Sequence, residues 1–174
     1  MLTDHDLRIA FNEYKDAVYR FAWRMTNSAS AAEDILQEVF LAVLRDRTRF
    51  ERGRGELRSF LLGIARNLAL KRLRNDSRWT TLDEAEFVTP LIELDTFNAA
   101  EALGTAVQQL PPLQREALIL STYEELTLEQ IAQLTAVDTG AVKARLHRAR
   151  ENLKRVLAPM KSSLNGRSKH GTAE

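Results

Sequence analysis

Basic side chains between residues 139 and 155 have the types and spacing that DNA binding requires. The stretch holds six Lys/Arg and a single acid, Glu151. If these cations only solvated a packed helix, interspersed acids would be expected to pair with them at i,i+4 spacing. The stretch therefore predicts a helix that lies on DNA. The residues expected at this contact are Thr139, Gly140, Lys143, Ala144, Arg145, His147 and Arg148.

Two short capped helices would hold these cations in place. Thr127 and Gln130 have the spacing of a capping box, which opens the first helix. The turn TAVD follows, and either Asp138 or Thr139 can cap the second helix. The apolar stripe of that second helix recurs at steps of 4, 3 and 4, in Val142, Leu146, Ala149 and Leu153. Two capped helices across such a turn are typical of a helix-turn-helix, whose second helix enters the major groove.

Three further helices are predicted in the first 76 residues. Ser30 and Glu33 have capping-box spacing and predict the start of the second. The third is expected from about Leu57 to Arg74, after the arginine-rich loop RDRTRFERGRGE. The first has apolar residues at helical steps, namely Leu7, Phe11, Tyr14, Val18, Phe21 and Met25.

Two more helices are predicted ahead of the pair, one starting near Asn98 and one over about 112–122. The residues after Pro159 are polar and small, and we expect them to be frayed. No segment alternates as a strand would. The fold class expected is therefore all-α, with two small helical bundles.

Charge divides the chain into three blocks. Residues 1–76 hold 14 Lys/Arg and 11 Asp/Glu, and residues 105–174 hold ten and seven, so each block has a net charge of +3. Residues 77–104 hold one Arg and six acids, a net charge of −5. This division predicts two modules that bind a polyanion, joined by an acidic linker that avoids it.

Several classes of protein are disfavoured by composition. The absence of cysteine excludes disulfides and thiolate metal sites. No apolar run approaches the length of a bilayer, so a soluble cytoplasmic protein without membrane insertion is expected. His5, His147 and His170 are isolated, and no phosphate-binding glycine loop is present, so we expect neither an enzyme nor a cofactor.

Three blocks of sequence, in this order and at this spacing, resemble one family. They are AEDILQEVFLAVL, LRSFLLGIARNLALKRLRN and LPPLQREALILSTYEELTLEQIAQLTAVDTGAVKARLHRARENLK. Together they resemble a bacterial RNA polymerase sigma factor of the extracytoplasmic-function (ECF) group. The resemblance implies a region 2 domain over 1–76, an acidic linker over 77–104, a region 4 domain with the helix-turn-helix over 105–158 and a polar tail over 159–174.

The resemblance assigns the −35 element to the helix-turn-helix and the −10 element to the front half. Residues 45–74 hold ten Lys/Arg and three acids. Such a basic surface is suited to binding DNA bases that have unpaired and unstacked. Asn67 is the candidate for a hydrogen bond to a base edge. The alternative is that Asn67 is a helix residue that faces solvent. The arginines are suited to binding phosphates. Phe50 could stack a base or belong to the core. The −10 and melting residues expected are Arg54, Arg58, Arg66, Asn67, Lys71, Arg72 and Arg74.

The resemblance also implies protein partners. The second helix would dock on the β′ clamp of core RNA polymerase. The alternative is that its polar face is simply exposed to solvent. Region 4 would meet the β flap, and an anti-sigma factor would hold a monomeric chain inactive. The family more often places hydroxyls where this chain has Ala141 and Ala144, which bears on base preference. The clamp residues expected are Asp34, Gln37, Glu38, Phe40 and Leu41.

Two other functions remain compatible with the sequence. A conventional helix-turn-helix transcription regulator would share the C-terminal element without requiring core polymerase. A helical adaptor could use its basic faces to bind acidic proteins. Core-dependent initiation on a promoter separates both from the sigma factor.

Overall fold

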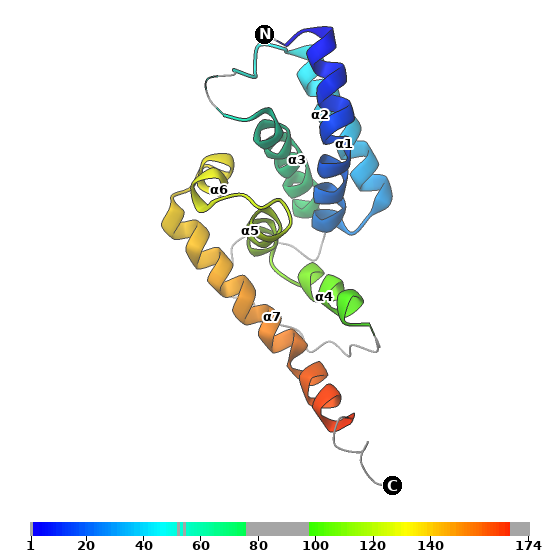
Figure 1. Cartoon of the computed structure of the whole chain (residues 1–174), viewed down its shortest axis with the longest axis vertical. Helices are drawn as coiled ribbons and strands as arrows, with labels where there is room; N and C mark the ends of the chain where they lie inside the picture. The colour runs from blue at the N-terminus through cyan, green and yellow to red at the C-terminus, as the bar shows by residue number, and fades with distance from the viewer. Residues whose placement is uncertain (1, 52, 54, 76–97, 168–174) are drawn as a thin grey trace.

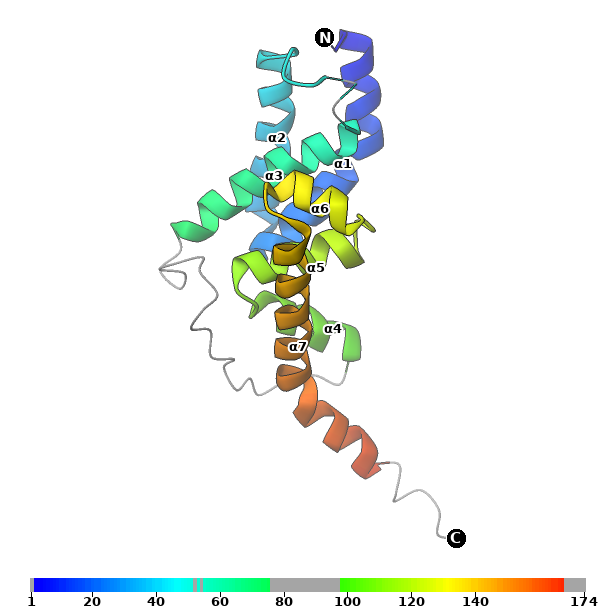
Figure 2. The same cartoon turned by 90° about the vertical axis from the view of Figure 1, so that its left-hand side faces the viewer.

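The computed structural model describes residues 2–51, 53, 55–75 and 98–167, and this part of the chain forms seven helices and no strand, so the all-α prediction is confirmed. The front bundle contains α1 (Asp4–Thr26), α2 (Ala29–Arg45) and α3 (Leu57–Arg74). Helices α1 and α2 run antiparallel side by side, and α3 crosses them (Figures 1 and 2).

The turn between α1 and α2 differs from the sequence prediction. Asn27 ends α1 in the left-handed region, at φ 53°, and the chain becomes extended at Ser28. The Ser28 hydroxyl then accepts a bond from the Ala31 amide at 3.2 Å, so Ser28 is the N-cap. The predicted Ser30–Glu33 capping box is therefore wrong, because the helix has already begun at Ala29 when the chain reaches Ser30.

Apolar side chains from all three front helices meet in one core. Phe21 and Met25 of α1, Ile35 of α2 and Leu61 of α3 are fully buried. Phe11, predicted to face inward, is instead 41% exposed and packs edge-on against Phe40, with 5.0 Å between ring centroids. Lys15 Nζ of the same helix lies 5.5 Å from the centre of the Phe11 ring.

The rear bundle contains α4 (Ala99–Gln108), α5 (Pro112–Thr122), α6 (Leu128–Thr135) and α7 (Thr139–Arg167). Helix α4 begins after the Asn98 cap and so includes residues 99–104 of the range assigned to the linker. Pro112 occupies the first turn of α5, where its missing N–H leaves no bond unmade. Helix α7 passes Pro159 and continues to Arg167, so the predicted fraying after Pro159 is wrong for residues 159–167.

Proline inside a helix removes one backbone bond without forcing the helix to end. Figure 2 shows α7 changing direction in its last part, as a proline within a helix would cause.

The two bundles pack against each other through α5. This helix lies between the front bundle and α7 (Figure 1), and it is buried almost all round, including Gln114, Arg115 and Glu116. One apolar cluster contains residues of both bundles, such as Leu61 in front and Ile131 behind. The two predicted bundles are thus present, and they share a core. No helix in the part of the chain described here is long and apolar enough to span a membrane.

Candidate nucleic-acid interface

The start of α7 is built as the helix-turn-helix pattern predicts. The Thr127 hydroxyl accepts from the Gln130 amide at 3.2 Å, and the Gln130 side chain accepts from the Thr127 amide at 2.9 Å, which completes the capping box of α6. Asp138 Oδ1 accepts from the Ala141 amide at 2.7 Å and caps α7. A Cβ added to Gly140 would lie 3.0 Å from that same Oδ1. The glycine therefore leaves room for the cap of its own helix.

The predicted DNA-contacting residues on α7 divide into an exposed set and a half-buried set. Val142, Leu146 and Ala149 are buried, as the apolar stripe predicted. Opposite them, the exposed residues are Gly140, Lys143, His147 and Arg148. The half-buried ones are Thr139, Ala144 and Arg145. An exposed, capped helix start with cations on its outer face can enter a major groove.

Helix α3 presents a second group of predicted DNA contacts. Asn67, Lys71 and Arg74 are exposed, while Arg54 lies outside the described residues. Arg58 donates to the Glu124 carboxylate and, at 3.0 Å, to the Glu124 carbonyl. Lys71 and Arg74 can therefore meet a nucleic-acid backbone as the chain stands, whereas Arg58 is engaged with the rear bundle.

Burial raises the pKa of the Glu124 carboxyl above its ordinary value of 4.5, and the nearby Arg58, Arg24 and Arg20 guanidinium groups only partly offset this. The cause is loss of water around a carboxylate that is 5% exposed.

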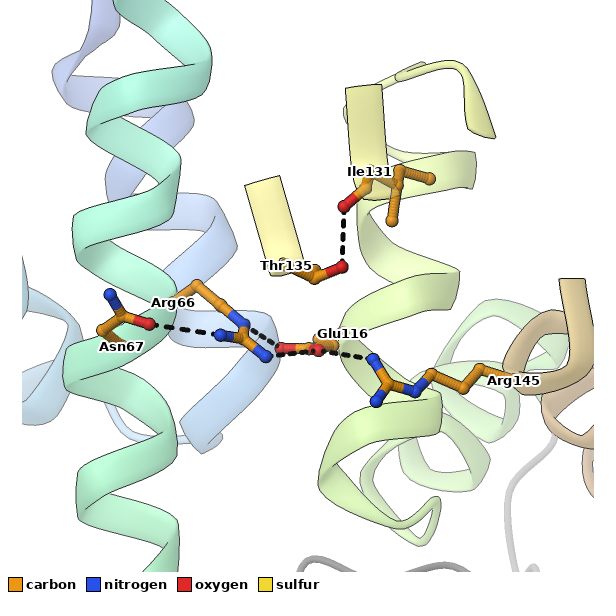
Figure 3. A network of polar contacts seen from close by, with 6 residues as sticks. All are labelled: Arg66, Asn67, Glu116, Ile131, Thr135 and Arg145. Carbon is orange, nitrogen blue, oxygen red and sulfur yellow. Dashed lines mark hydrogen bonds and ion pairs between the residues drawn. The ribbon is translucent and has the colours of Figure 1, made fainter. Parts of the chain in front are cut away.

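Arg66 and Arg145 come from opposite bundles and share one carboxylate. Arg66 Nε lies 2.6 Å from Glu116 Oε2, and its Nη2 lies 3.0 Å from Oε1. Arg145 Nη1 lies 3.5 Å from the same Oε1. Figure 3 shows the carboxylate between the two guanidinium groups, and Glu116 is fully buried. Arg66 also donates to the Asn67 side-chain oxygen at 3.2 Å. The structure thus brings predicted −10 and −35 residues together around an acid that the sequence did not single out.

Helix α2 carries an exposed face with acids and leucines. Asp34, Gln37 and Glu38 are exposed, and Leu41 is 44% exposed. Leu44, one turn further on and 47% exposed, extends this face and was missed by the sequence analysis. Its signal was its i+3 spacing from Leu41, away from the apolar stripe. We call Asp34, Gln37, Glu38, Leu41 and Leu44 the α2 face.

Two aromatic side chains that the sequence analysis considered for binding belong to the core. Phe40, predicted to contact polymerase, is 8% exposed and lies against Phe11. Phe50 is equally buried and packs against Phe60 at 5.5 Å, so its role in this structure is in the core.

The α2 face adjoins the basic side of α3. Arg72 Nη2 lies 3.3 Å from Asp34 Oδ2 and 3.6 Å from Glu38 Oε1. A hollow of about 460 Å³ is lined by Glu38 and Leu41 on one side and by Asn67 on the other. A protein bound to the α2 face and a strand bound along α3 would therefore be neighbours.

Comparisons with known proteins agree over nearly the whole chain. Residues 10–79 match the family described as Sigma-70 region 2, and residues 100–153 match Sigma-70, region 4. RNA polymerase sigma factor CarQ of Myxococcus xanthus is 33% identical over 154 residues, covering 86% of this chain and 88% of that protein. ECF RNA polymerase sigma factor SigW of Bacillus subtilis is 28% identical over 159 residues, covering 83% and 84%.

A solved structure shares the fold. It is the sigma factor RpoE in complex with the anti-sigma factor NepR from Bartonella quintana, with a TM-score of 0.69 and 24% sequence identity. The likeness covers 88% of this chain and 97% of that one.

Proposed function

The chain belongs to the ECF group of bacterial RNA polymerase sigma factors, and we propose how its two bundles divide the work of promoter recognition. In this proposal the start of α7 reads the −35 element in the major groove. Lys143, His147 and Arg148 make the contacts from its exposed face. The observation that carries the proposal is this exposed, Asp138-capped basic helix, held in a helix-turn-helix within a chain of this family.

In this proposal the front bundle binds the −10 element and the core polymerase. Asn67, Lys71 and Arg74 would follow the separated strand along α3, with Asn67 at a base edge and the two cations on phosphates. The α2 face would dock on the clamp of the core enzyme. Leu41 and Leu44 are half-exposed leucines that an interface would cover, and the acids around them supply a polar rim.

Control by an anti-sigma factor is a further part of the proposal. The solved relative with the same fold is held in complex with such a factor. An anti-sigma factor that covers the α2 face would compete directly with core polymerase. Competition between the two for the chain, measured with purified components, tests this part separately.

The central experiment adds the purified chain to core RNA polymerase and maps transcript starts on a genomic template. We expect specific initiation that requires both the chain and the core. A Leu41→Asp variant should bind core more weakly, whereas a Lys143→Ala variant should bind core normally and bind the −35 element more weakly. Sequence-specific DNA binding by the chain alone, with no core-dependent start on any template, would instead favour a conventional regulator.

A further inference from the structure

A hollow where α3, α5 and α7 meet has the size and the lining of a small-molecule site. Its volume is about 660 Å³, and pockets for small ligands typically measure roughly 300–1,000 Å³. Lys71 and Arg74 line it from α3, Leu113 from α5 and Arg145 from α7. It differs from the hollow between the α2 face and α3, although Asn67 lines both. We call it the α3–α7 hollow.

Cations converge on the α3–α7 hollow from both bundles. Arg66, Lys71 and Arg74 belong to α3, and Arg145 belongs to α7. Among the described residues that line the hollow, none is acidic. When the Glu116 carboxylate behind Arg66 and Arg145 is counted, four cations and one anion give the site a formal net charge of +3. A concave site with this charge suits a small ligand that carries several negative charges.

Two of these four cations are already held in position. Bonds of 2.6 and 3.0 Å fix the Arg66 guanidinium on the buried Glu116 carboxylate, and Arg145 lies 3.5 Å from it. The two arginine side chains are 15% and 16% exposed, so part of each can still meet a ligand. Arg66 uses three of its five N–H groups on Glu116 and Asn67, which leaves two. Donors that are fixed beforehand need not be ordered when the ligand binds, which favours affinity.

The other two cations are available to a ligand. Lys71 and Arg74 are exposed, and neither makes a hydrogen bond or ion pair within the part of the chain that the structure describes. They stand three residues apart on one face of α3, where the Cβ atoms of such a pair are about 5–6 Å apart. Both side chains can therefore reach one chain of linked phosphates, to which charged donors bind strongly.

Apolar and amide groups complete the lining. Leu70 of α3 and Leu113 of α5 both line the hollow and offer a surface on which a nucleobase can lie. Asn67 Oδ1 accepts from Arg66 at 3.2 Å, which leaves the Asn67 side-chain NH₂ to donate to a base or sugar oxygen. A nucleic-acid strand along α3 would need only the α3 wall. The second wall, from α5 and α7, is what favours a small ligand over a strand.

We propose that the α3–α7 hollow is a binding site for a small molecule with two or more linked phosphates, of the size of a nucleoside triphosphate. The phosphates lie on the cations of α3 and α7. Binding of this ligand to the free chain is independent of the proposed function, and only its consequence rests on that function. Because Lys71 and Arg74 are also the cations proposed for the −10 strand, bound phosphates compete with that strand for them.

The first test measures binding to the full-length chain by isothermal titration calorimetry, without core polymerase or DNA and at constant ionic strength. The probes are ATP, inorganic tripolyphosphate and inorganic phosphate. We expect one ATP or tripolyphosphate per chain, and binding of inorganic phosphate at least tenfold weaker. Tighter binding of ATP than of tripolyphosphate would identify a nucleotide site, and equal binding would identify a site for the phosphate chain alone. Binding of several tripolyphosphate ions per chain, or equal affinity for phosphate and tripolyphosphate, would overturn the proposal.

Charge-removing variants then locate the site. Lys71→Gln and Arg145→Gln should each weaken tripolyphosphate binding at least fivefold, while Arg8→Gln, at an exposed position on α1, should leave it unchanged. Circular dichroism checks that each variant is folded. Lys71 is exposed, so its variant keeps the test decisive even if Arg145→Gln unfolds the chain. Unchanged affinity in Lys71→Gln, or in a folded Arg145→Gln chain, would overturn the site, and so would an equal loss in Arg8→Gln.

The last test addresses competition with the promoter. The wild-type chain, core polymerase and promoter DNA are mixed without nucleotides, and permanganate reactivity of thymines reports opening. At equal ionic strength and equal free Mg²⁺, tripolyphosphate should lower opening at least threefold more than inorganic phosphate does. Equal effects of the two ions would overturn the competition. Failure of the wild-type chain to open any promoter without either ion would count against the proposed function instead, so the two failures are distinguishable.

Discussion

Arg66 of α3 and Glu116 of α5 lie 50 residues apart in the chain and form a two-bond ion pair, with atom separations of 2.6 and 3.0 Å. The carboxylate is fully buried and Arg145 approaches it from the other side. A buried carboxylate is stable only when its partners satisfy it, so the two bundles depend on each other at this point.

Lys143→Ala should weaken binding of the holoenzyme to −35 DNA roughly five- to tenfold and lower the slope of log affinity against log salt by about 1, because one phosphate contact is lost. Fluorescence anisotropy over a salt series measures both quantities. Lys154→Ala is the matched control, since Lys154 lies three turns further along α7 and pairs with Glu151 at 2.8 Å. Equal losses for the two variants would argue against a groove contact at the start of α7.

Arg74→Ala should reduce open-complex formation several-fold more than closed-complex binding, because Arg74 is exposed at the end of α3 beside the proposed strand path. Permanganate reactivity of unpaired thymines reports opening, and filter binding reports the closed complex. Arg8→Ala removes an exposed arginine from α1 and should change neither. If open-complex formation and closed-complex binding fell by the same factor, Arg74 would not contact the separated strand.

Leu41→Asp should weaken core polymerase binding about tenfold or more, because it puts a charge where an interface would cover a half-exposed leucine. Its thermal unfolding should stay close to that of wild type. Leu103→Asp alters a leucine of similar exposure, 38%, on α4 and is the control. Core affinity measured by biolayer interferometry should distinguish them, and the assignment of the α2 face fails if both variants bind core equally.

Thr127→Ala should destabilise the helix-turn-helix by about 1 kcal/mol, because the Gln130 amide loses its capping oxygen. For a chain of this size that corresponds to a fall in Tm of roughly 2–4 °C. Scanning calorimetry measures the shift. Thr122→Ala, at the exposed end of α5, should leave Tm nearly unchanged.

The pKa of Glu124 should report how closely the two bundles pack around this carboxyl group. Burial raises it above 4.5 in the folded chain, so the folded chain binds this proton more tightly than the unfolded chain does. The contribution of protonated Glu124 to stability is fully present below pH 4.5 and is lost as pH rises through the raised pKa. Carboxyl NMR titration of the Glu116→Gln variant should place the Glu124 midpoint nearer 4.5 than in wild type. Identical midpoints would mean that Glu124 stays buried in the variant.

The sequence predicted features whose causes are local. The bounds of α3 and α5, the Thr127–Gln130 box and the inward stripe of α7 all follow from side chains within a few residues of one another. The misplaced cap at Ser30 is local as well. Ser28 offered the same hydroxyl two residues earlier, and only the left-handed turn at Asn27 decides between them.

The pairing of Arg66 with Glu116 could not be predicted in this way. Arg66 stands in a basic stretch, and a count of charges does not distinguish a cation that faces DNA from one held by an acid 50 residues away. A signal did exist in α5, where Gln114, Arg115 and Glu116 stand between the apolar residues Leu113 and Ala117–Leu120. Polar residues in a helix buried almost all round need partners from neighbouring elements. The identity of those partners depends on how the bundles dock.

The cap of α7 restricts how the promoter preference of this chain could be re-engineered. A side chain at position 140 would press on Asp138 Oδ1, 3.0 Å from its Cβ, and that oxygen already accepts from the Ala141 amide. Any side chain introduced at position 140 alone therefore requires Asp138 Oδ1 to shift, which disturbs the cap of α7. Positions 138 and 140 have to be varied as a pair, while the surface at Lys143 and His147 can be changed independently of them.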